Sequence, residues 1–461
     1  MKKNGIYEGT VTELKFPNKG VVCTEEGNVL VKGVLPKQTV SFILTKKKNG
    51  RFEGRLKEVL KRAPEEIESP CPHFGICGGC SYQNLPYEEE LKLKDSQVRT
   101  ILDRAIVNEY EYEGITGSPA DSGYRNKMEF SFGNEFLDGP LTLGMHRAGR
   151  FNDVITVDKC RIVDGDYRLI ISETLGFFMD RGIPFYRKHT EKGYLRHLVI
   201  RKGKKTGEIL LLIETTTQLD FDMREYAELL LSLGKRKENG LEGNVSGILH
   251  LKNDNAADNV QGDDISILYG RDYIYDEVLG LRFRITPFSF FQTNTLGAEL
   301  LYSKAREYAL SVKDTGENPV IFDLYSGTGT IGQVMSGAAS KVIGIEIVRE
   351  AVGAARENAA LNHLTNTEFI AGDVLKELGD IEEKPDIIIL DPPRDGCAPK
   401  ALLKILDTGV KNLIYISCKI TSLERDLIPL QEAGYRVIKA AAVDMFPNTS
   451  GVETIVLMTK S

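Results

Sequence analysis

The chain has 461 residues and a formal net charge of −7, with 41% hydrophobic and 27% charged residues. This length predicts two or three domains, and the composition excludes a disordered or membrane-spanning protein. No signal sequence opens the chain, so we expect a cytoplasmic protein without membrane contact. The charge is uneven: residues 1–62 carry +8 and the remainder −15. A basic module on an acidic body indicates that one part holds a polyanion while chemistry occurs in another, although a solvated basic surface is the alternative.

Residues 1–62 are predicted to form a small RNA-binding barrel. Between residues 4 and 60, short alternating runs are separated by Pro and Gly turns. Strands this short and evenly spaced indicate a closed barrel of the oligonucleotide-binding kind. Cys23 falls within one strand, where we expect a packed thiol. One hairpin carries basic side chains that can contact phosphates without reading sequence: Lys46, Lys47, Lys48 and Arg51.

Three cysteines lie within ten residues, as Cys71, Cys77 and Cys80, and a Gly-Gly pair separates the last two. Small residues let the backbone wrap around an inorganic centre, and Cys160 is the best candidate for a fourth thiolate. Four thiolates without a second Cys-x-x-Cys pair favour a 4Fe-4S cluster over a zinc ribbon. His73 leaves a Cys3His zinc site open, and unrelated reduced cysteines are the third interpretation.

Residues 63–285 are expected to form a mostly β central domain that holds this cluster and faces RNA. The sequence predicts a helix over 87–107, followed by several short strands between 127 and 285. Basic residues punctuate these strands, although a solvated β face accounts for the charges almost as well.

Residues 286–461 are expected to form an α/β catalytic domain. Strand and helix alternate regularly, which predicts a parallel sheet covered on both faces and a closing antiparallel hairpin at one edge. Near its start, a buried strand runs through Asp323 into the loop Gly327-x-Gly329-x-x-Gly332, which opens a helix. A carboxylate at the mouth of this loop repels pyrophosphate and attracts a cation, so Asp323 favours S-adenosylmethionine over NAD.

Further candidates for ligand binding stand at strand ends and before the glycine loop. Glu346 ends an apolar run, where α/β nucleotide folds place an acid against ribose hydroxyls. Asp373 follows the next strand in the same way. Gln292 comes after Phe290 and Phe291, so its amide can hold a base edge while a ring stacks on the base.

Three residues near the carboxyl end fit one reaction. Asp391 begins an Asp-Pro-Pro-Arg loop at the edge where open α/β sheets bind ligands, and Cys418 ends the next strand as a candidate nucleophile. Glu453 is an acid in an apolar run, where burial raises its pKa and suits it to accept a proton. A thiolate that adds to C6 of uracil makes C5 nucleophilic toward a sulfonium methyl, and a base then removes the C5 proton. The target base has to leave its stack to reach such a pocket.

Four motifs follow one another along the chain: Asp-Leu-Tyr-Ser-Gly-Thr-Gly, Asp-Pro-Pro-Arg, Ser-Cys and Val-Glu-Thr. Together with the four cysteines upstream, this set resembles the RNA 5-methyluridine methyltransferases of the TrmA/RlmD group. The resemblance covers nearly the whole chain. It implies an N-terminal TRAM barrel, a central domain with a 4Fe-4S cluster and a C-terminal class I methyltransferase domain. By position it implies that Cys418 is the nucleophile and Glu453 the proton acceptor. The residues that we expect to bind S-adenosylmethionine are Gln292, Tyr325, Glu346 and Asp391, together with Asp323, Gly327 and Asp373.

Barrel and cluster together imply the ribosomal-RNA branch of this family, so we expect a monomer that methylates 23S rRNA. Two positions depart from the family pattern. Lys419-Ile420 stands where Asn-Pro usually follows the nucleophile, and Gly451 stands where a His often precedes the acid. The alternatives are methylation of tRNA, a non-catalytic iron-sulfur RNA-binding protein, an NAD-linked oxidoreductase and a methylase of exocyclic amines.

Overall fold

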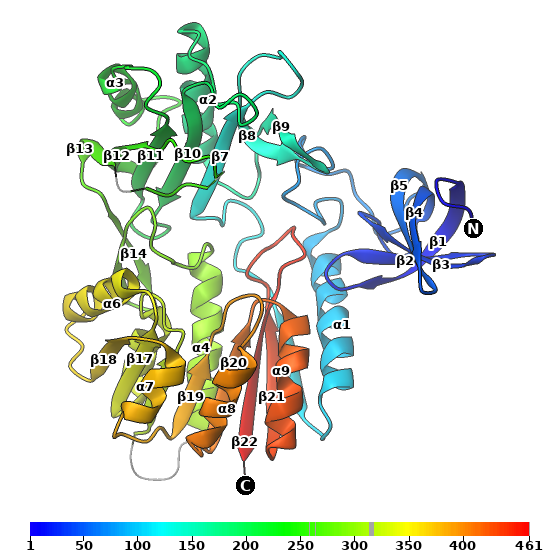
Figure 1. Ribbon diagram of the computed structural model, residues 1–461, viewed down its shortest axis with the longest axis vertical. Coiled ribbons are helices and arrows are strands. Elements are labelled where there is room, and N and C mark those ends of the chain that lie inside the picture. The colour runs from blue at the N-terminus through cyan, green and yellow to red at the C-terminus, as the bar shows by residue number, and fades with distance from the viewer. Residues whose placement is uncertain (258, 263, 313–317, 461) are drawn as a thin grey trace.

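The structure is a computed structural model that describes residues 1–257, 259–262, 264–312 and 318–460. It consists of an N-terminal barrel, a seven-stranded sheet and an eight-stranded sheet (Figure 1). None of the described helices is both long and apolar enough to cross a membrane.

The first part of the chain forms a closed barrel, as its strand pattern predicted. Its strands close in the order β1-β2-β3-β5-β4 around a core that includes Val22, Val31 and Phe42. The expectation for Cys23 is wrong: its side chain is exposed, because it alternates with the inward-pointing Val22 along its strand. The strands are β1 (Ile6–Lys15), β2 (Lys19–Thr24), β3 (Gly27–Lys32), β4 (Thr39–Lys48) and β5 (Arg51–Lys61).

The central sheet has the order β13-β12-β11-β10-β7-β8-β9, and two helices, α2 (Gly165–Asp180) and α3 (Arg224–Leu233), pack against it. Their aromatic side chains, among them Phe178 and Tyr226, share one core with Ile200 of the sheet. The strands are β7 (Lys127–Gly133), β8 (Thr142–Arg147), β9 (Arg150–Thr156), β10 (Leu195–Lys202), β11 (Glu208–Thr215), β12 (Asn244–Lys252) and β13 (Ile265–Gly270).

The C-terminal sheet has the order β18-β17-β16-β19-β20-β22-β21-β6, and β22 alone runs antiparallel to its neighbours. The predicted parallel sheet and the antiparallel hairpin of its last two strands are therefore confirmed, but the hairpin is not at the edge, because β6 pairs with β21 beyond it. The strands are β6 (Glu111–Thr116), β16 (Val320–Leu324), β17 (Lys341–Glu346), β18 (Thr367–Ala371), β19 (Ile387–Leu390), β20 (Asn412–Ser417), β21 (Tyr435–Val443) and β22 (Glu453–Lys460).

Both faces of this sheet are buried, which explains why its strands are almost uniformly apolar. Ile389 of β19 faces a core formed with α4, whereas its neighbour Ile388 faces a core formed with α1 and α9. The helices around the sheet are α1 (Tyr87–Ala105), α4 (Thr295–Ser311), α5 (Thr330–Met335), α6 (Arg349–Leu361), α7 (Val374–Asp380), α8 (Pro399–Asp407) and α9 (Ile420–Glu432).

Elements from before residue 286 also contribute to this C-terminal unit. The strand β6 pairs with β21 at the sheet edge, and α1 packs beside α9. The hairpin of β14 (Ile274–Val278) and β15 (Leu281–Ile285) contributes to the same core as α4. The sheet that carries the glycine loop is thus completed by segments from the range expected for the central domain.

Candidate active site

The order of the strands brings the predicted catalytic groups to one edge of the sheet. Because β16, β19 and β20 are parallel neighbours, Tyr325, Asp391 and Cys418 each follow the end of a strand at the same edge. The antiparallel β22 starts at this edge, with its Thr454 opposite Ser417 of β20. The start of β22 therefore brings Glu453 next to the end of β20.

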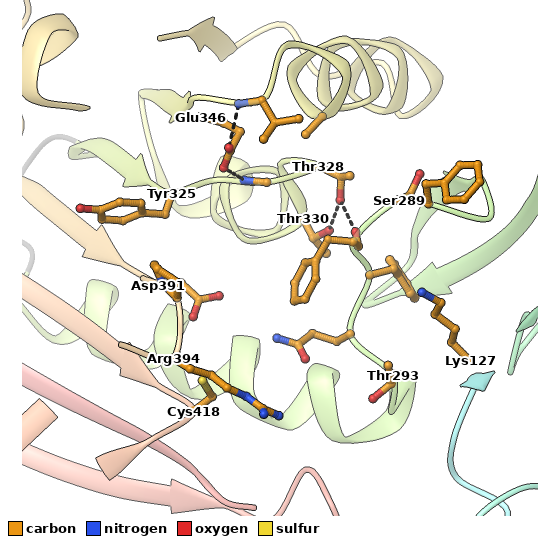
Figure 2. A pocket seen from close by; sticks show the side chains of 18 of the residues that line it. Lys127, Ser289, Thr293, Tyr325, Thr328, Thr330, Glu346, Asp391, Arg394 and Cys418 are labelled. Atoms are coloured by element: carbon orange, nitrogen blue, oxygen red, sulfur yellow. Dashed lines mark hydrogen bonds between the residues drawn. The ribbon is translucent and has the colours of Figure 1, made fainter. Parts of the chain in front are cut away.

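These groups open into one cavity of about 2200 Å³. Figure 2 shows Asp391, Arg394 and Cys418 on one side of this cavity and Thr293 and Lys127 on the other. Seven of the nine residues predicted for catalysis and cofactor binding line it: Gln292, Tyr325, Gly327, Glu346, Asp391, Cys418 and Glu453.

The glycine loop turns tightly between β16 and α5. Gly327 and Gly329 have φ values of 54° and 73°, in the region that favours glycine. A Cβ at Gly329 would lie 2.6 Å from the ring of Phe369, so a larger residue does not fit. Thr328 donates its hydroxyl to the carbonyl of Phe290 at 2.9 Å, which ties the loop to the segment before α4.

Glu346 stands where the sequence predicts an acid for a ribose. One carboxylate oxygen accepts from the Gly327 N–H at 3.0 Å, and the other accepts from the Val348 N–H at 2.9 Å (Figure 2). These bonds fix the carboxylate beside the loop, and each oxygen keeps a lone pair that can accept from a hydroxyl group.

Two predicted cofactor residues do not reach the cavity. Asp323 lies behind the glycine loop rather than at its mouth: it is fully buried and accepts from the Gly332 N–H at 2.8 Å. Burial raises its pKa to about 8, although the Gly332 N–H opposes this shift. Asp373 caps α7 by accepting from the Leu375 N–H at 3.0 Å, as an acid at a helix start commonly does.

The cavity surrounds three ionisable groups whose pKa values are all raised. Burial, followed by the charge of Asp391, raises the pKa of Glu453 to about 8. Asp391 keeps part of its surface open to the cavity, but burial by the surrounding protein raises its pKa to about 7. Burial, with Glu453 and Asp391 nearby, raises the pKa of the Cys418 thiol to about 11. The unliganded site therefore holds acids whose pKa values lie near neutrality, which suits proton transfer.

Arg394 is a functional candidate that the sequence interpretation left without a role. Its guanidinium lies beside Cys418 in Figure 2 and opposes the upward pKa shifts of both Cys418 and Glu453. The signal in the sequence was the fourth residue of Asp-Pro-Pro-Arg. Ser422 holds the Arg394 backbone by donating its hydroxyl to the carbonyl at 2.7 Å.

A buried carboxylate anchors the far end of this loop, and no sequence motif indicated it. Asp426, on α9, accepts from the Cys397 N–H and from the Tyr415 hydroxyl, each at 2.7 Å. Arg425 donates to its other oxygen at 2.7 Å and also to the Asp395 carbonyl at 2.7 Å. Asp426 thereby fixes the loop that starts at Asp391.

The two departures from the family pattern also lie at the cavity. Lys419 lines it and lies 3.6 Å from the Asp395 carboxylate, while its backbone N–H donates to the Ser417 hydroxyl at 3.3 Å. At Gly451, a Cβ would lie 2.8 Å from the ring of Phe446. The Phe446 ring therefore takes up the space that a side chain at 451 would enter.

The four predicted cluster cysteines line a second cavity of about 850 Å³, together with His73. Burial raises the pKa of Cys80 to about 12, and Cys160, Cys77 and Cys71 each add to the shift, so the thiols lie near one another. In the part of the chain that the structure describes, no three His, Cys, Asp or Glu side chains are placed to hold a metal ion.

Comparison with known proteins agrees with this geometry. Residues 262–461 match the model of the tRNA (Uracil-5-)-methyltransferase family. The chain is 46% identical to an uncharacterized RNA methyltransferase of Clostridium tetani, over 99% of this chain and 98% of that one. It is 48% identical to another from Caldanaerobacter subterraneus subsp. tengcongensis, over 100% of both chains.

A solved structure shares the fold over nearly the full length. It is the Pyrococcus abyssi tRNA (uracil-54, C5)-methyltransferase in complex with S-adenosyl-L-homocysteine, with a TM-score of 0.77 and 23% identity over 98% of this chain and 100% of that one. The family match covers the cavity-bearing domain, and the two relatives match along the whole chain. The chain therefore belongs to the family of S-adenosylmethionine-dependent RNA uracil-C5 methyltransferases.

Proposed function

We propose that the protein methylates C5 of a uridine in 23S rRNA through a covalent adduct between Cys418 and C6 of the uracil. The observation that carries the proposal is the pairing of β20 with β22, which brings a thiol and a buried acid together beside the glycine loop. An oxidoreductase or an RNA-binding scaffold has no use for this pair.

The reaction balances with these residues. The thiol loses its proton to solvent in the open cavity, and the Cys418 thiolate adds to C6, so that electrons move toward O4 and C5 becomes nucleophilic. C5 takes the methyl group of the donor substrate, S-adenosylmethionine, which leaves as the neutral thioether. Glu453 accepts the C5 proton, the C5–C6 double bond re-forms, and Cys418 departs as a thiolate. Arg394 stabilises the negative charge on the Cys418 sulfur in the first and the last step of the reaction.

Most of the remaining cavity residues serve the methyl donor. Glu346 accepts hydrogen bonds from the ribose of the donor, and Gly327 lets the backbone approach it. Tyr325 packs against the donor, and the amide of Gln292 forms hydrogen bonds with it. Asp391 stands between the donor and the uracil and favours the sulfonium by its charge.

We also propose that Cys71, Cys77, Cys80 and Cys160 hold a 4Fe-4S cluster. Four thiols line one cavity, and donors point at the sulfur atoms: the Gly79 N–H lies 3.4 Å from Cys77 and the Gln83 amide 3.7 Å from Cys80. Such donors stabilise thiolates. A cluster spreads its irons, so its ligands need not converge as closely as those of a single zinc ion. When bound, the cluster supplies a structural cross-link.

The test is to map 5-methyluridine in 23S rRNA and in tRNA after incubation with the protein and S-adenosylmethionine. We expect methylation of 23S rRNA, and transfer to tRNA alone would assign the other substrate class. Cys418→Ala should abolish turnover while S-adenosylmethionine binding persists, because Glu346 and the glycine loop are unchanged. An RNA with 5-fluorouridine at the target should trap the wild-type enzyme, since fluorine does not leave as a proton does. Turnover by Cys418→Ala would refute the covalent route.

We propose further that the protein acts as a monomer in the cytoplasm, where its RNA substrate is assembled. The barrel of residues 1–62 serves RNA binding, because its charge of +8 stands against an acidic remainder. Sedimentation of the purified protein with and without RNA tests the monomeric state.

A further inference from the structure

The active-site cavity is larger than its two substrates require. A cavity for one drug-sized ligand measures about 300–1000 Å³. The volume of about 2200 Å³ therefore accommodates the methyl donor, the target uridine and at least part of another nucleotide. The residues that line the additional space indicate which kind of ligand it binds.

Part of this lining comes from the N-terminal barrel. Phe16 and Pro17, in the turn between β1 and β2, line the same cavity as Cys418 and Glu453. The barrel lies beside α1 in Figure 1, which brings this turn to the sheet. Residues that are about 400 positions apart in sequence thus share one wall.

Hydrogen bonds hold the barrel turn in place. The Tyr82 hydroxyl donates to the Pro17 carbonyl at 2.9 Å, and Tyr82 itself is only 1% exposed. The Gln97 amide, on α1, donates to the Leu14 carbonyl at 2.9 Å. Phe16 also packs against the hydrophobic core beneath α1. Its half-buried ring is therefore fixed at the cavity before any ligand binds.

Other residues that line the same cavity suit unpaired nucleic acid. Phe288 and Phe290 line the cavity and are 45% and 64% exposed, which is unusual for large aromatic rings. Arg125 and Lys127 add positive charge, although Lys127 is paired with Glu129 at 2.6 Å. Exposed rings next to cations bind single strands by stacking on base faces. Bases within a duplex keep those faces covered.

We propose that Phe16 stacks on the nucleotide adjacent to the target uridine, so that the barrel recognises the RNA inside the active-site cavity. This inference rests on the proposed function, because it takes the uridine to lie near Cys418. It assigns Phe16 as a residue that determines substrate specificity, and Tyr82 as a positioning residue that holds it. The substrate class that follows is an unpaired RNA segment of at least two nucleotides.

The test measures binding of short RNA to the whole chain carrying Cys418→Ala, loaded with S-adenosylhomocysteine. The probe is the trinucleotide A-U-A, in which the single uracil sets the register. Two further probes carry an abasic residue in place of the first or the last adenine. Each is titrated against the background protein and against the same protein with Phe16→Leu, which keeps most of the packing volume. Phe136→Ala is the control, because this ring is 61% exposed in the β7–β8 loop, away from the cavity lining.

We expect one of the two abasic probes to bind about tenfold more weakly than A-U-A, as loss of one base–aromatic stack predicts. Phe16→Leu should weaken the binding of A-U-A by a similar factor. It should not weaken the binding of that abasic probe any further, because the base that stacks on Phe16 is already missing. Tyr82→Phe should show a smaller loss in the same direction, and Phe136→Ala none. Unchanged binding by Phe16→Leu, or an equal loss with all three probes, would overturn the inference. The proposed function is tested separately, by measuring methylation of rRNA by the wild-type protein.

Discussion

The raised pKa of Glu453 makes the last step of the proposed reaction strongly dependent on pH. Glu453 is 3% exposed, and burial together with the charge of Asp391 raises its pKa to about 8. A base acts only when deprotonated, so about one tenth of the molecules are competent at pH 7 and about one hundredth at pH 6. Decay of the methylated Cys418–RNA adduct should therefore accelerate about tenfold per pH unit up to pH 8 and then level off.

The assay follows adduct formation and decay in a single turnover, with samples denatured at intervals and the protein–RNA band quantified. Replacing the carboxylate by an amide, in Glu453→Gln, removes the proton acceptor but keeps the shape of the side chain. Adduct decay should slow by about 10²- to 10⁴-fold, as loss of a general base predicts, and lose its pH dependence. The adduct should accumulate, since addition at C6 needs only Cys418.

A second variant tests the origin of the shift. Asp391→Asn removes a charge that raises the pKa of Glu453, so the rise in decay rate should move to lower pH. Equal decay of the wild-type adduct from pH 6 to pH 9, or release of RNA by Glu453→Gln as fast as by wild type, would show that Glu453 is not the proton acceptor.

In the folded protein, the pKa values of Asp323, Asp391 and Glu453 lie above their ordinary values. The folding stability that these groups provide at acid pH is therefore lost as they ionise. The melting temperature of the unliganded protein should fall between pH 4.5 and pH 8 in a calorimetric series. Asp426→Asn weakens the buried bonds to Cys397 and Tyr415, so it should cost about 1.5–3 kcal/mol of unfolding free energy in denaturant titrations and lower kcat more than it raises KM for the donor. Cys160→Ser should lower the iron content of protein purified without oxygen, measured by elemental analysis, whereas Cys23→Ser, on the barrel surface, should not.

The sheet that carries the cavity was predicted well from the sequence because its two signals, apolar runs and short connecting loops, are local. Uniformly apolar runs such as Ile387–Leu390 indicate strands buried on both faces, and the loops between them are short. Parallel order then brings Asp391 and Cys418 to one edge without further information. The strand β6 escaped this reasoning, because its pairing with β21 joins segments more than 300 residues apart.

Side-chain direction was the weaker part of the prediction. Asp323 belongs to β16, where successive residues face opposite sides, and the sequence does not say which side carries the cavity. Its carboxylate meets the Gly332 N–H behind the loop instead. Asp426 and Phe16 were missed for a related reason: Asp426 holds a loop from another element, Phe16 reaches the cavity from the barrel, and neither stands in a motif. Their roles depend on tertiary contacts alone.

The antiparallel strand explains how the proposed base can stand at the start of β22 and still lie next to the proposed nucleophile at the end of β20. Had β22 run parallel to β20, its first residue would lie at the opposite edge, about six residues or roughly 20 Å from Cys418. The reversal places Thr454 opposite Ser417 and so brings Glu453 to the carboxyl edge. It also makes Glu453 the first residue of a buried strand, where the loop before it opens to the cavity but the strand after it excludes water. One feature of topology thus supplies both the position of the proposed base and the burial that raises its pKa toward neutrality.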